Sequence, residues 1–207
     1  MDKVYPIIGM SPGNSYFKDE VVKKLIQKVV EEFSNTAVLI ADVPAIRTYQ
    51  ALGYPENIAR REKALPQGNN LRNKVKRAMD ELGYTPEQVR IIDWKNEIED
   101  NQKYREKYDK VVKLYETNRA FKIAADEATR EVLEHTGKVV SDIQTAITIA
   151  VEYLLSELAF MEFGPEFFNV EKVAYVYHRK WPVYESYISG EFDGAVRSKL
   201  DSIELKV

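Results

Sequence analysis

A short apolar run sets the fold class that this chain is expected to adopt. Residues 37–41 are apolar throughout, with Asn35 before them and Asp42 and Pro44 after them. A strand that is apolar at every position is typical of a parallel sheet that helices cover on both faces. The run therefore predicts an α/β fold with a parallel sheet flanked by helices.

Strand and helix patterns alternate along the rest of the chain. The other expected strands are residues 4–8, 89–94, 173–177 and 203–207. The expected helices are one from Asp19, one from Leu71 to about Gly83, two within residues 103–134, one capped by Ser141-Asp142 and ended by Gly164-Pro165, and a short one from Pro182. Strands separated by helices predict βαβ units within a single domain over residues 1–207.

Composition excludes several kinds of site. The chain has no cysteine and only two histidines, so disulfides, thiolate ligands, cysteine nucleophiles and a histidine-rich metal cluster are not expected. No apolar run approaches the roughly 20 residues that a membrane span needs, and the first residues lack the apolar stretch of a signal peptide. We therefore expect a cytoplasmic protein without a metal site.

The positive charge is concentrated in one segment. The formal net charge of the chain is only −3, but residues 57–79 hold seven basic residues against Glu62 alone, which leaves −9 for the remainder. Such a face is either an ordinary solvated helix surface or a contact for a phosphate backbone, and the lack of interleaved acids favours the second. The basic residues are Arg60, Arg61, Lys63, Arg72, Lys74, Lys76 and Arg77.

Ser11 lies in a turn-rich loop directly after the first expected strand. Gly9-Met10-Ser11-Pro12-Gly13 matches G-x-S-x-G, but a hydrolase elbow needs the backbone N–H of the residue after the serine, and Pro12 has none. Open α/β sheets bind ligands beyond the carboxyl ends of their strands, which favours a functional Ser11. Alternatively, Ser11 is a turn residue that caps the next helix, as Ser15 could also do.

Three motifs together resemble those of the cyclodipeptide synthase family. They are Gly9-x-Ser11-x-x-Asn14-Ser15-Tyr16-Phe17, Tyr153-x-x-x-Glu157 and Tyr177-His178. Asp42, Pro44 and the basic segment also fall where that family has them, whereas Ala159 stands where some members have proline. Asn14, Tyr177 and His178 resemble the subfamily that has Asn, Tyr and His at these places. The resemblance implies a Rossmann-like sheet similar to the catalytic domain of class I tyrosyl- and tryptophanyl-tRNA synthetases.

The resemblance also implies roles for individual residues. Ser11 would carry the first aminoacyl group as an ester, after which a second aminoacyl-tRNA supplies the other half of a cyclic dipeptide. Tyr153 and Glu157, four apart on a helix, would hold the α-ammonium. Tyr177 would orient Ser11 or donate a hydrogen bond to the tetrahedral intermediates. Asn14 and His178 would support these groups, which requires the strand to end at Tyr177, because successive strand side chains point to opposite faces.

An aminoacyl ester is already activated, so no ATP, metal or other cofactor is expected. The basic segment would bind tRNA, and neither DNA nor a membrane is an expected partner. By the same resemblance, apolar residues would line the pocket for the first side chain, which favours an apolar residue such as Leu, Phe or Met. These residues are Ile7, Gly9, Leu39, Ala41, Phe160 and Met161.

Two other functions are open to the sequence. One is a non-catalytic tRNA-binding module of synthetase-like fold, which explains the basic segment but not Ser11, Glu157 and Tyr177 together. The other is a serine hydrolase, against which Pro12 argues. No heptad pattern is present, so we expect a monomer.

Overall fold

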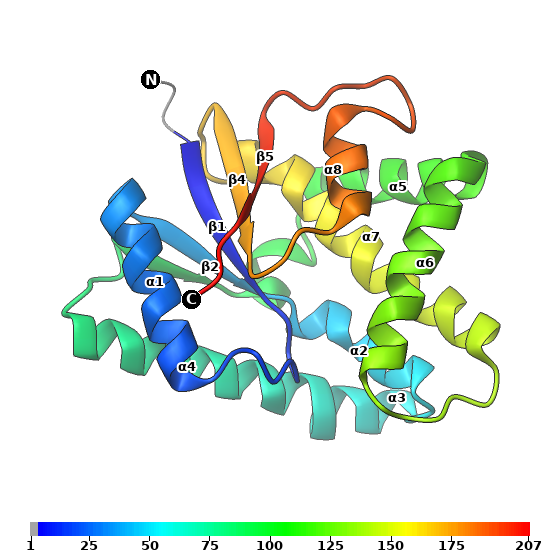
Figure 1. Cartoon of the computed structure of the whole chain (residues 1–207), viewed down its shortest axis with the longest axis horizontal. Coiled ribbons are helices and arrows are strands. Elements are labelled where there is room, and N and C mark those ends of the chain that lie inside the picture. Colours follow the sequence, from blue (N-terminus) through cyan, green and yellow to red (C-terminus); the bar gives the residue numbers. More distant parts are fainter. Residues whose placement is uncertain (1–3) are drawn as a thin grey trace.

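The computed structural model describes residues 4–207, which form an α/β fold around a five-stranded parallel sheet (Figure 1). The strand order across the sheet is β3-β2-β1-β4-β5, and every neighbouring pair is parallel. The strands are β1 (Val4–Met10), β2 (Thr36–Ile40), β3 (Val89–Ile92), β4 (Lys172–Tyr177) and β5 (Leu200–Glu204). The prediction of a parallel sheet flanked by helices is confirmed.

Two strand boundaries differ from the prediction. The third strand stops at Ile92, and Trp94 begins a short π-helical segment, η2 (Trp94–Ile98), whose start is capped by the Asp93 carboxylate. The Trp94 ring is buried against Tyr104 and Phe160, so its apolar character reflects core packing and not strand pairing. The last strand lies earlier than residues 203–207, because β5 pairs in register with β4 and both end together.

The two faces of the sheet are covered by different helices. Alternate residues of β1 point to opposite faces, so Ile8 and Met10 pack against α1 and α4, whereas Ile7 packs against α7. The helices are α1 (Asp19–Phe33), α2 (Asp42–Ala51), α3 (Glu56–Ile58), α4 (Leu65–Leu82), α5 (Gln102–Thr117), α6 (Arg119–His135), α7 (Ile143–Phe167) and α8 (Pro182–Ser189), with a π-helical segment η1 (Ala59–Ala64) before α4.

Most expected helix boundaries are found. Asn118 separates α5 from α6, so the prediction of two helices is confirmed, and Asp142 caps α7 through the backbone N–H groups of Gln144 and Thr145. The prediction that α7 ends at Gly164-Pro165 is wrong. Pro165 lies in its last turn, where the missing N–H breaks a single helical bond and the chain continues to Phe167.

The N-terminal boundary of α4 was also predicted too late. α4 begins at Leu65 and not at Leu71, because it continues directly from η1 and because Pro66 is tolerated in a first helical turn. Pro182 begins α8 as expected. None of the helices within residues 4–207 is long and apolar enough to cross a membrane.

The direction of the chain connections reverses between β1 and β4. From β1 the sheet extends through β2 and β3 on one side, and through β4 and β5 on the other. Chain connections on the two sides therefore leave in opposite directions, and ligands of open α/β sheets bind where this reversal occurs. Ser11 follows β1 and Tyr177 ends β4, so both lie at this place.

A buried ion pair fixes α4 to the end of β2. Arg72 lies 2.5 Å from the carboxylate of Asp42, whose side chain is only 3% exposed. Gly68 lies one turn earlier on α4, and a Cβ atom there would meet the Asp42 side chain at 2.5 Å. Asp42 is the first residue of α2, so α2 and α4 are in close contact at this point. The buried carboxylate of Asp42 has Arg72 as its ion-pair partner.

Replacing Arg72 should therefore destabilise the fold. Arg72→Glu places a second carboxylate against buried Asp42, and we expect the free energy of unfolding to fall by about 3 kcal/mol or more. Chemical denaturation measures this change. Lys76→Glu, on the same helix but exposed, is the matched control and should shift the free energy of unfolding little. Equal effects of the two variants would contradict a structural role for the Arg72–Asp42 pair.

Candidate active site

The Ser11 hydroxyl lies between two tyrosines from distant parts of the chain. Its Oγ is 3.0 Å from the hydroxyl of Tyr153 on α7 and 3.1 Å from the hydroxyl of Tyr177 at the end of β4. The loop of Ser11 begins where β1 ends, so the parallel pairing of β1 with β4 brings Ser11 close to Tyr177, and α7 adds Tyr153. Ser11 is partly buried, and its hydroxyl contacts the phenol groups of Tyr153 and Tyr177.

The carboxylate of Glu157 is the most deeply buried charge near Ser11. Its Oε1 is 3.1 Å from the Tyr153 hydroxyl and 3.0 Å from the Tyr175 hydroxyl, and its Oε2 accepts from Tyr184 at 2.5 Å. Only 6% of Glu157 is exposed. Three phenols from α7, β4 and α8 thus provide the partners that a buried carboxylate requires.

Burial shifts the protonation equilibria of this cluster. Desolvation raises the pKa of Glu157, and the hydrogen bonds from Tyr184, Tyr175 and Tyr153 oppose that shift. Burial and the neighbouring carboxylate raise the pKa of each of these three phenols well above its ordinary value. The phenols therefore keep their protons and act as donors, while Glu157 is a stronger base than an exposed carboxylate.

A phenol has one proton, which gives the contacts a direction. When Glu157 is ionised it can only accept, so the Tyr153 proton points to Glu157. The Tyr153 oxygen then accepts from Ser11, and the Ser11 oxygen accepts from Tyr177. Ser11 is linked to the buried carboxylate through one intervening hydroxyl, and its own proton points towards that carboxylate.

Asn14 and His178 form the outer side of the cluster. The Asn14 Nδ2 atom is 3.3 Å from both the Tyr177 hydroxyl and His178 Nε2, and its Oδ1 accepts from the Tyr16 backbone N–H. His178 lies just after β4, and its ring stacks on Tyr16 at a centroid distance of 4.1 Å. Because the strand ends at Tyr177, both Tyr177 and His178 reach Asn14, as the sequence analysis required.

Burial and the charges of Arg179 and Lys206 lower the pKa of His178 to about 4. The imidazole is therefore neutral at pH 7. Since the Asn14 amide nitrogen only donates, Nε2 must accept, and the ring proton resides on Nδ1. Protonation of His178 would replace this acceptor by a donor and break the contact with Asn14.

The structure brings together all six residues predicted to be catalytic. They are Ser11, Asn14, Tyr153, Glu157, Tyr177 and His178. The alternative in which Ser11 or Ser15 caps the next helix is wrong, because Lys18 is the residue before α1 and no side chain bonds that helix start.

Sequence reasoning missed two residues of the cluster, Tyr175 and Tyr184. Tyr175 lies two positions before Tyr177 and therefore shares its face of β4, which is a signal that the sequence contained. Tyr184 comes from α8, and no spacing rule connects it to Glu157. The only signal for Tyr184 in the sequence was that a buried carboxylate such as Glu157 needs hydrogen-bond donors, which indicates that further polar partners exist.

The residues predicted to line the first side-chain pocket lie beneath Ser11, in the core on the α7 side of the sheet. Ile7 comes from β1, Leu39 from β2, and Ala41 directly follows β2. Phe160 and Met161 come from α7. All five are at most 1% exposed, and Gly9 is buried with them. The Tyr175 ring lies against Gly9 in this region.

Three of the seven predicted tRNA-binding residues are engaged in contacts within the chain. Arg72 pairs with Asp42, Lys74 donates to the Phe17 carbonyl at 2.7 Å, and Arg77 pairs with Asp19. The sequence showed their charge but not these partners, which lie far away along the chain.

The other four basic residues, Arg60, Arg61, Lys63 and Lys76, form no ion pair with residues 4–207. Lys63 lies over the Tyr54 ring at 5.0 Å. The N-terminal half of α4 lies at the same edge of the sheet as Ser11, since Arg72 binds Asp42, which follows β2. The basic face and the Ser11 cluster therefore share one edge of the molecule.

One hollow of the described residues lies away from the Ser11 cluster. It has a volume of about 690 Å³ and is bounded by α5, the end of α7 and the segment before β5. Its three acids are paired with basic side chains, as in the contact of Glu162 with Arg197, and none of the Ser11 cluster lines it. Within residues 4–207, no group of histidine and acidic side chains is arranged to hold a metal ion.

Comparison with known proteins identifies the family. The family model described as "Cyclodipeptide synthase" matches residues 4–199. This chain belongs to the cyclodipeptide synthase family. It is therefore an enzyme, and the family that the three motifs resemble is confirmed. Among curated relatives, the cyclo(L-leucyl-L-leucyl) synthase of Bacillus subtilis is 27% identical over 196 residues, which are 92% of this chain and 77% of the relative.

Solved structures of other cyclodipeptide synthases share the fold. A Mycobacterium tuberculosis protein, described as demonstrating that these enzymes are related to type I tRNA synthetases, has a TM-score of 0.79 at 20% identity, with 97% of this chain and 84% of that chain covered. The synthase of Candidatus Glomeribacter gigasporarum, solved bound to Phe-tRNAPhe, has a TM-score of 0.65 at 16% identity and covers 99% and 88%. The predicted Rossmann-like fold is confirmed.

The depressed pKa of His178 predicts a pH effect on stability. The unfolded imidazole binds a proton below about pH 6.5, but the folded one does so only below about 4. The unfolded state therefore binds more protons between these values, and the free energy of unfolding should fall as the pH drops from 6.5 to 4. His178→Gln should reduce this slope, measured by urea denaturation at several pH values.

His135 provides the control for this measurement. It is the other histidine of the chain and is exposed on α6. His135→Gln should keep the slope of the unmodified protein. If His178→Gln also left the slope of the free energy of unfolding against pH unchanged, the His178 imidazole would have to bind its proton equally well in the folded and unfolded protein. That result would contradict its role as acceptor from Asn14.

Proposed function

We propose that this cyclodipeptide synthase joins two aminoacyl groups, taken in turn from two aminoacyl-tRNAs, through an ester on Ser11. The observation that carries the proposal is the linkage of Ser11 to the buried Glu157 through the Tyr153 hydroxyl. A non-catalytic tRNA-binding module would not need a serine hydroxyl linked to a buried carboxylate. The Phe-tRNAPhe bound by the Candidatus Glomeribacter gigasporarum relative supports aminoacyl-tRNA as the substrate.

In the first step, the Ser11 oxygen attacks the ester carbonyl of an aminoacyl-tRNA. The Ser11–acyl bond forms, the bond to the tRNA ribose oxygen breaks, and the Ser11 proton is balanced by the proton that the released tRNA hydroxyl gains. The contact from Ser11 to Tyr153 gives the serine proton a path towards Glu157. Tyr177 and Asn14 supply side-chain donors beside Ser11, where Pro12 lacks the backbone donor.

The second and third steps form the two peptide bonds. The amine of the acyl group on Ser11 attacks the ester of a second aminoacyl-tRNA, which releases that tRNA and leaves a dipeptidyl ester on Ser11. The new α-amine then attacks this ester, which closes the ring and restores the Ser11 hydroxyl. Each amine loses a proton and each departing oxygen gains one, so no cofactor is needed for balance.

Glu157 and Tyr153 are suited to hold and deprotonate the α-ammonium. An α-amine has a pKa of roughly 7.7–8.0, so it must lose a proton before it can attack. Burial raises the pKa of Glu157 and brings it closer to that of the amine, which makes proton transfer easier. Tyr177 orients Ser11, while Asn14 and His178 act as positioning residues through their contacts with Tyr177 and with each other.

We further infer that the chain belongs to the Asn, Tyr and His subfamily, with support from the mutual contacts of Asn14, Tyr177 and His178. The first aminoacyl group is proposed to be apolar, since the residues beneath Ser11 are apolar. A single domain over residues 1–207, a monomeric state and a cytoplasmic location stay predictions.

Replacing Ser11 tests the covalent step directly. Ser11→Ala should abolish the mass increase of the intact protein after incubation with aminoacyl-tRNA, and it should abolish diketopiperazine formation, because no hydroxyl remains to carry the ester. Ser15→Ala is the matched control in the same loop, where Ser15 is exposed, and it should retain both. Undiminished acylation of Ser11→Ala would place the nucleophile elsewhere.

The basic face can be tested at residues that the fold does not use. Arg61→Glu combined with Lys76→Glu should raise KM for aminoacyl-tRNA about tenfold or more and flatten its dependence on salt, because phosphate contacts release counterions. Lys110→Glu combined with Lys113→Glu makes the same charge change on exposed positions of α5 and serves as control. Equal KM values for the two double variants would make the α4 face an ordinary solvated surface.

A further inference from the structure

Tyr175 occupies the space directly beneath the Ser11 loop. It pairs with Ile7 in the register of β4 and β1, and its ring extends from there towards Gly9. A Cβ atom on Gly9 would lie 2.2 Å from the Tyr175 hydroxyl and 2.4 Å from the ring carbon that bears it. Glycine at position 9 is thus what leaves room for the phenol.

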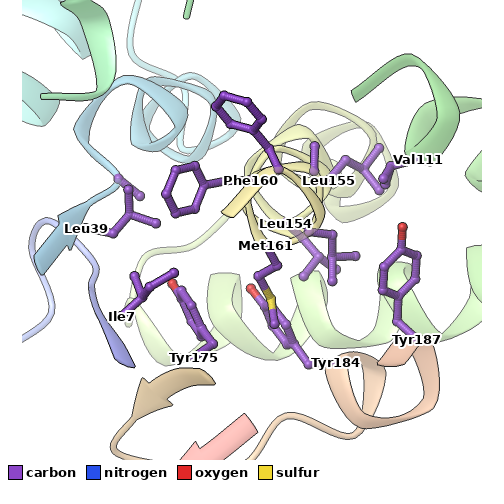
Figure 2. Close-up of a cluster of buried hydrophobic side chains, with 14 of the residues drawn as sticks. Ile7, Leu39, Val111, Leu154, Leu155, Phe160, Met161, Tyr175, Tyr184 and Tyr187 are labelled. Atoms are coloured by element: carbon purple, nitrogen blue, oxygen red, sulfur yellow. The ribbon is translucent and has the colours of Figure 1, made fainter. Parts of the chain in front are cut away.

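The Tyr175 ring lies among the residues expected to form the first side-chain pocket. Figure 2 shows it beside Ile7, with Leu39 and Phe160 nearby in the same core cluster. These residues have essentially no exposed surface, so the cluster is closed with Tyr175 in it. The volume that a bulky substrate side chain would fill is filled by the protein's own phenol.

Two further contacts hold Tyr175 in this position. Its hydroxyl donates to Glu157 at 3.0 Å. Its ring stacks on Tyr184 with an interplanar angle of 8°, and Tyr184 is itself bound to the same carboxylate. Moving Tyr175 aside would break a buried hydrogen bond to a charged group and separate two stacked rings, so the phenol is a fixed boundary.

The position of the acyl group follows from the two ends that hold it. In the proposed mechanism its carbonyl carbon is bonded to Ser11 Oγ and its α-ammonium is held by Glu157 and Tyr153, which puts its α-carbon between Ser11 and Glu157. Tyr175 reaches the same Oε1 atom of Glu157 as Tyr153 does. The side chain on that α-carbon, when directed into the core, therefore meets the Tyr175 hydroxyl first.

We propose that Tyr175 is a specificity-determining residue that limits the first aminoacyl group to a short side chain, glycine or alanine. The inference rests on the proposed function and narrows its apolar class. A leucine side chain carries three carbons beyond the alanine methyl, and these would need the space that the phenol ring fills. The chain would then differ from its Bacillus subtilis relative, whose name specifies leucyl groups.

Acylation of the unmodified protein tests this without any variant. The protein is incubated separately with alanyl-tRNA and leucyl-tRNA, and the intact mass of Ser11-acylated protein is followed with time. Alanine should be transferred at least about tenfold faster, in line with discrimination by steric exclusion from a filled pocket. Equal or faster transfer of leucine would overturn the inference, even if the variants below fail to fold.

Variants then assign the selection to Tyr175. Tyr175→Leu removes the ring and should shift the ratio of leucine to alanine transfer about tenfold or more towards leucine. Tyr175→Phe keeps the ring and should keep the preference for alanine. Tyr184→Phe is the matched control, because it also removes a hydroxyl from Glu157 while Tyr175 keeps its ring as the nearest neighbour of Gly9. It should leave the ratio unchanged whatever its effect on rate.

The outcomes separate this inference from the proposed function. Acylation of Ser11 with an unchanged leucine-to-alanine ratio in Tyr175→Leu would overturn the role of Tyr175 while leaving the covalent mechanism intact. Acylation by neither aminoacyl-tRNA, nor by a pool carrying all amino acids, would overturn the proposed function and this inference with it.

Discussion

A carboxylate that is removed from water must find hydrogen-bond donors within the protein, and Glu157 finds three. Tyr153 comes from its own helix, Tyr175 from β4 and Tyr184 from α8, so the charge is stable only when these elements are assembled. The same three elements surround the place where the sheet reverses its strand order. The site and the central packing of this face thus depend on one buried charge.

The arrangement also explains how Ser11 can be reactive without a hydrolase elbow. Pro12 removes the backbone N–H that an elbow uses, and no histidine contacts the serine, since His178 reaches it only through Asn14 and Tyr177. What remains is a line of hydroxyls in which Tyr177 donates to Ser11, Ser11 to Tyr153, and Tyr153 to Glu157. The hydrogen-bonded chain consists of neutral hydroxyl groups. The carboxylate of Glu157 at its buried end can only accept, which fixes the donor direction along the chain.

The sequence predicted the parallel sheet because residues 37–41 are apolar at every position. It predicted six clustered residues through motifs that lie at strand ends or one helical turn apart. It could not show Tyr184, which approaches Glu157 from α8 through tertiary packing alone. It also counted Arg72 as free positive charge, since nothing in the local pattern reveals that Asp42 will be its buried partner. The strand prediction for Trp94 fails for a similar reason. An apolar residue is expected both in a buried strand and in core packing outside the sheet, so its apolar character does not distinguish the two.

Tyr175 affects two properties of the site, the space beneath Ser11 and the pKa of Glu157. Its ring fills space beneath Ser11, and its hydroxyl is one of the donors that oppose the rise in the pKa of Glu157. A smaller apolar residue at this position would enlarge the pocket and remove a donor at the same time. The carboxylate would then lose part of its stabilisation as an ion and its pKa would rise further, closer to that of the α-amine. A smaller apolar residue at position 175 therefore changes both the size of the pocket and the basicity of Glu157, whereas phenylalanine would keep the ring and remove only the donor.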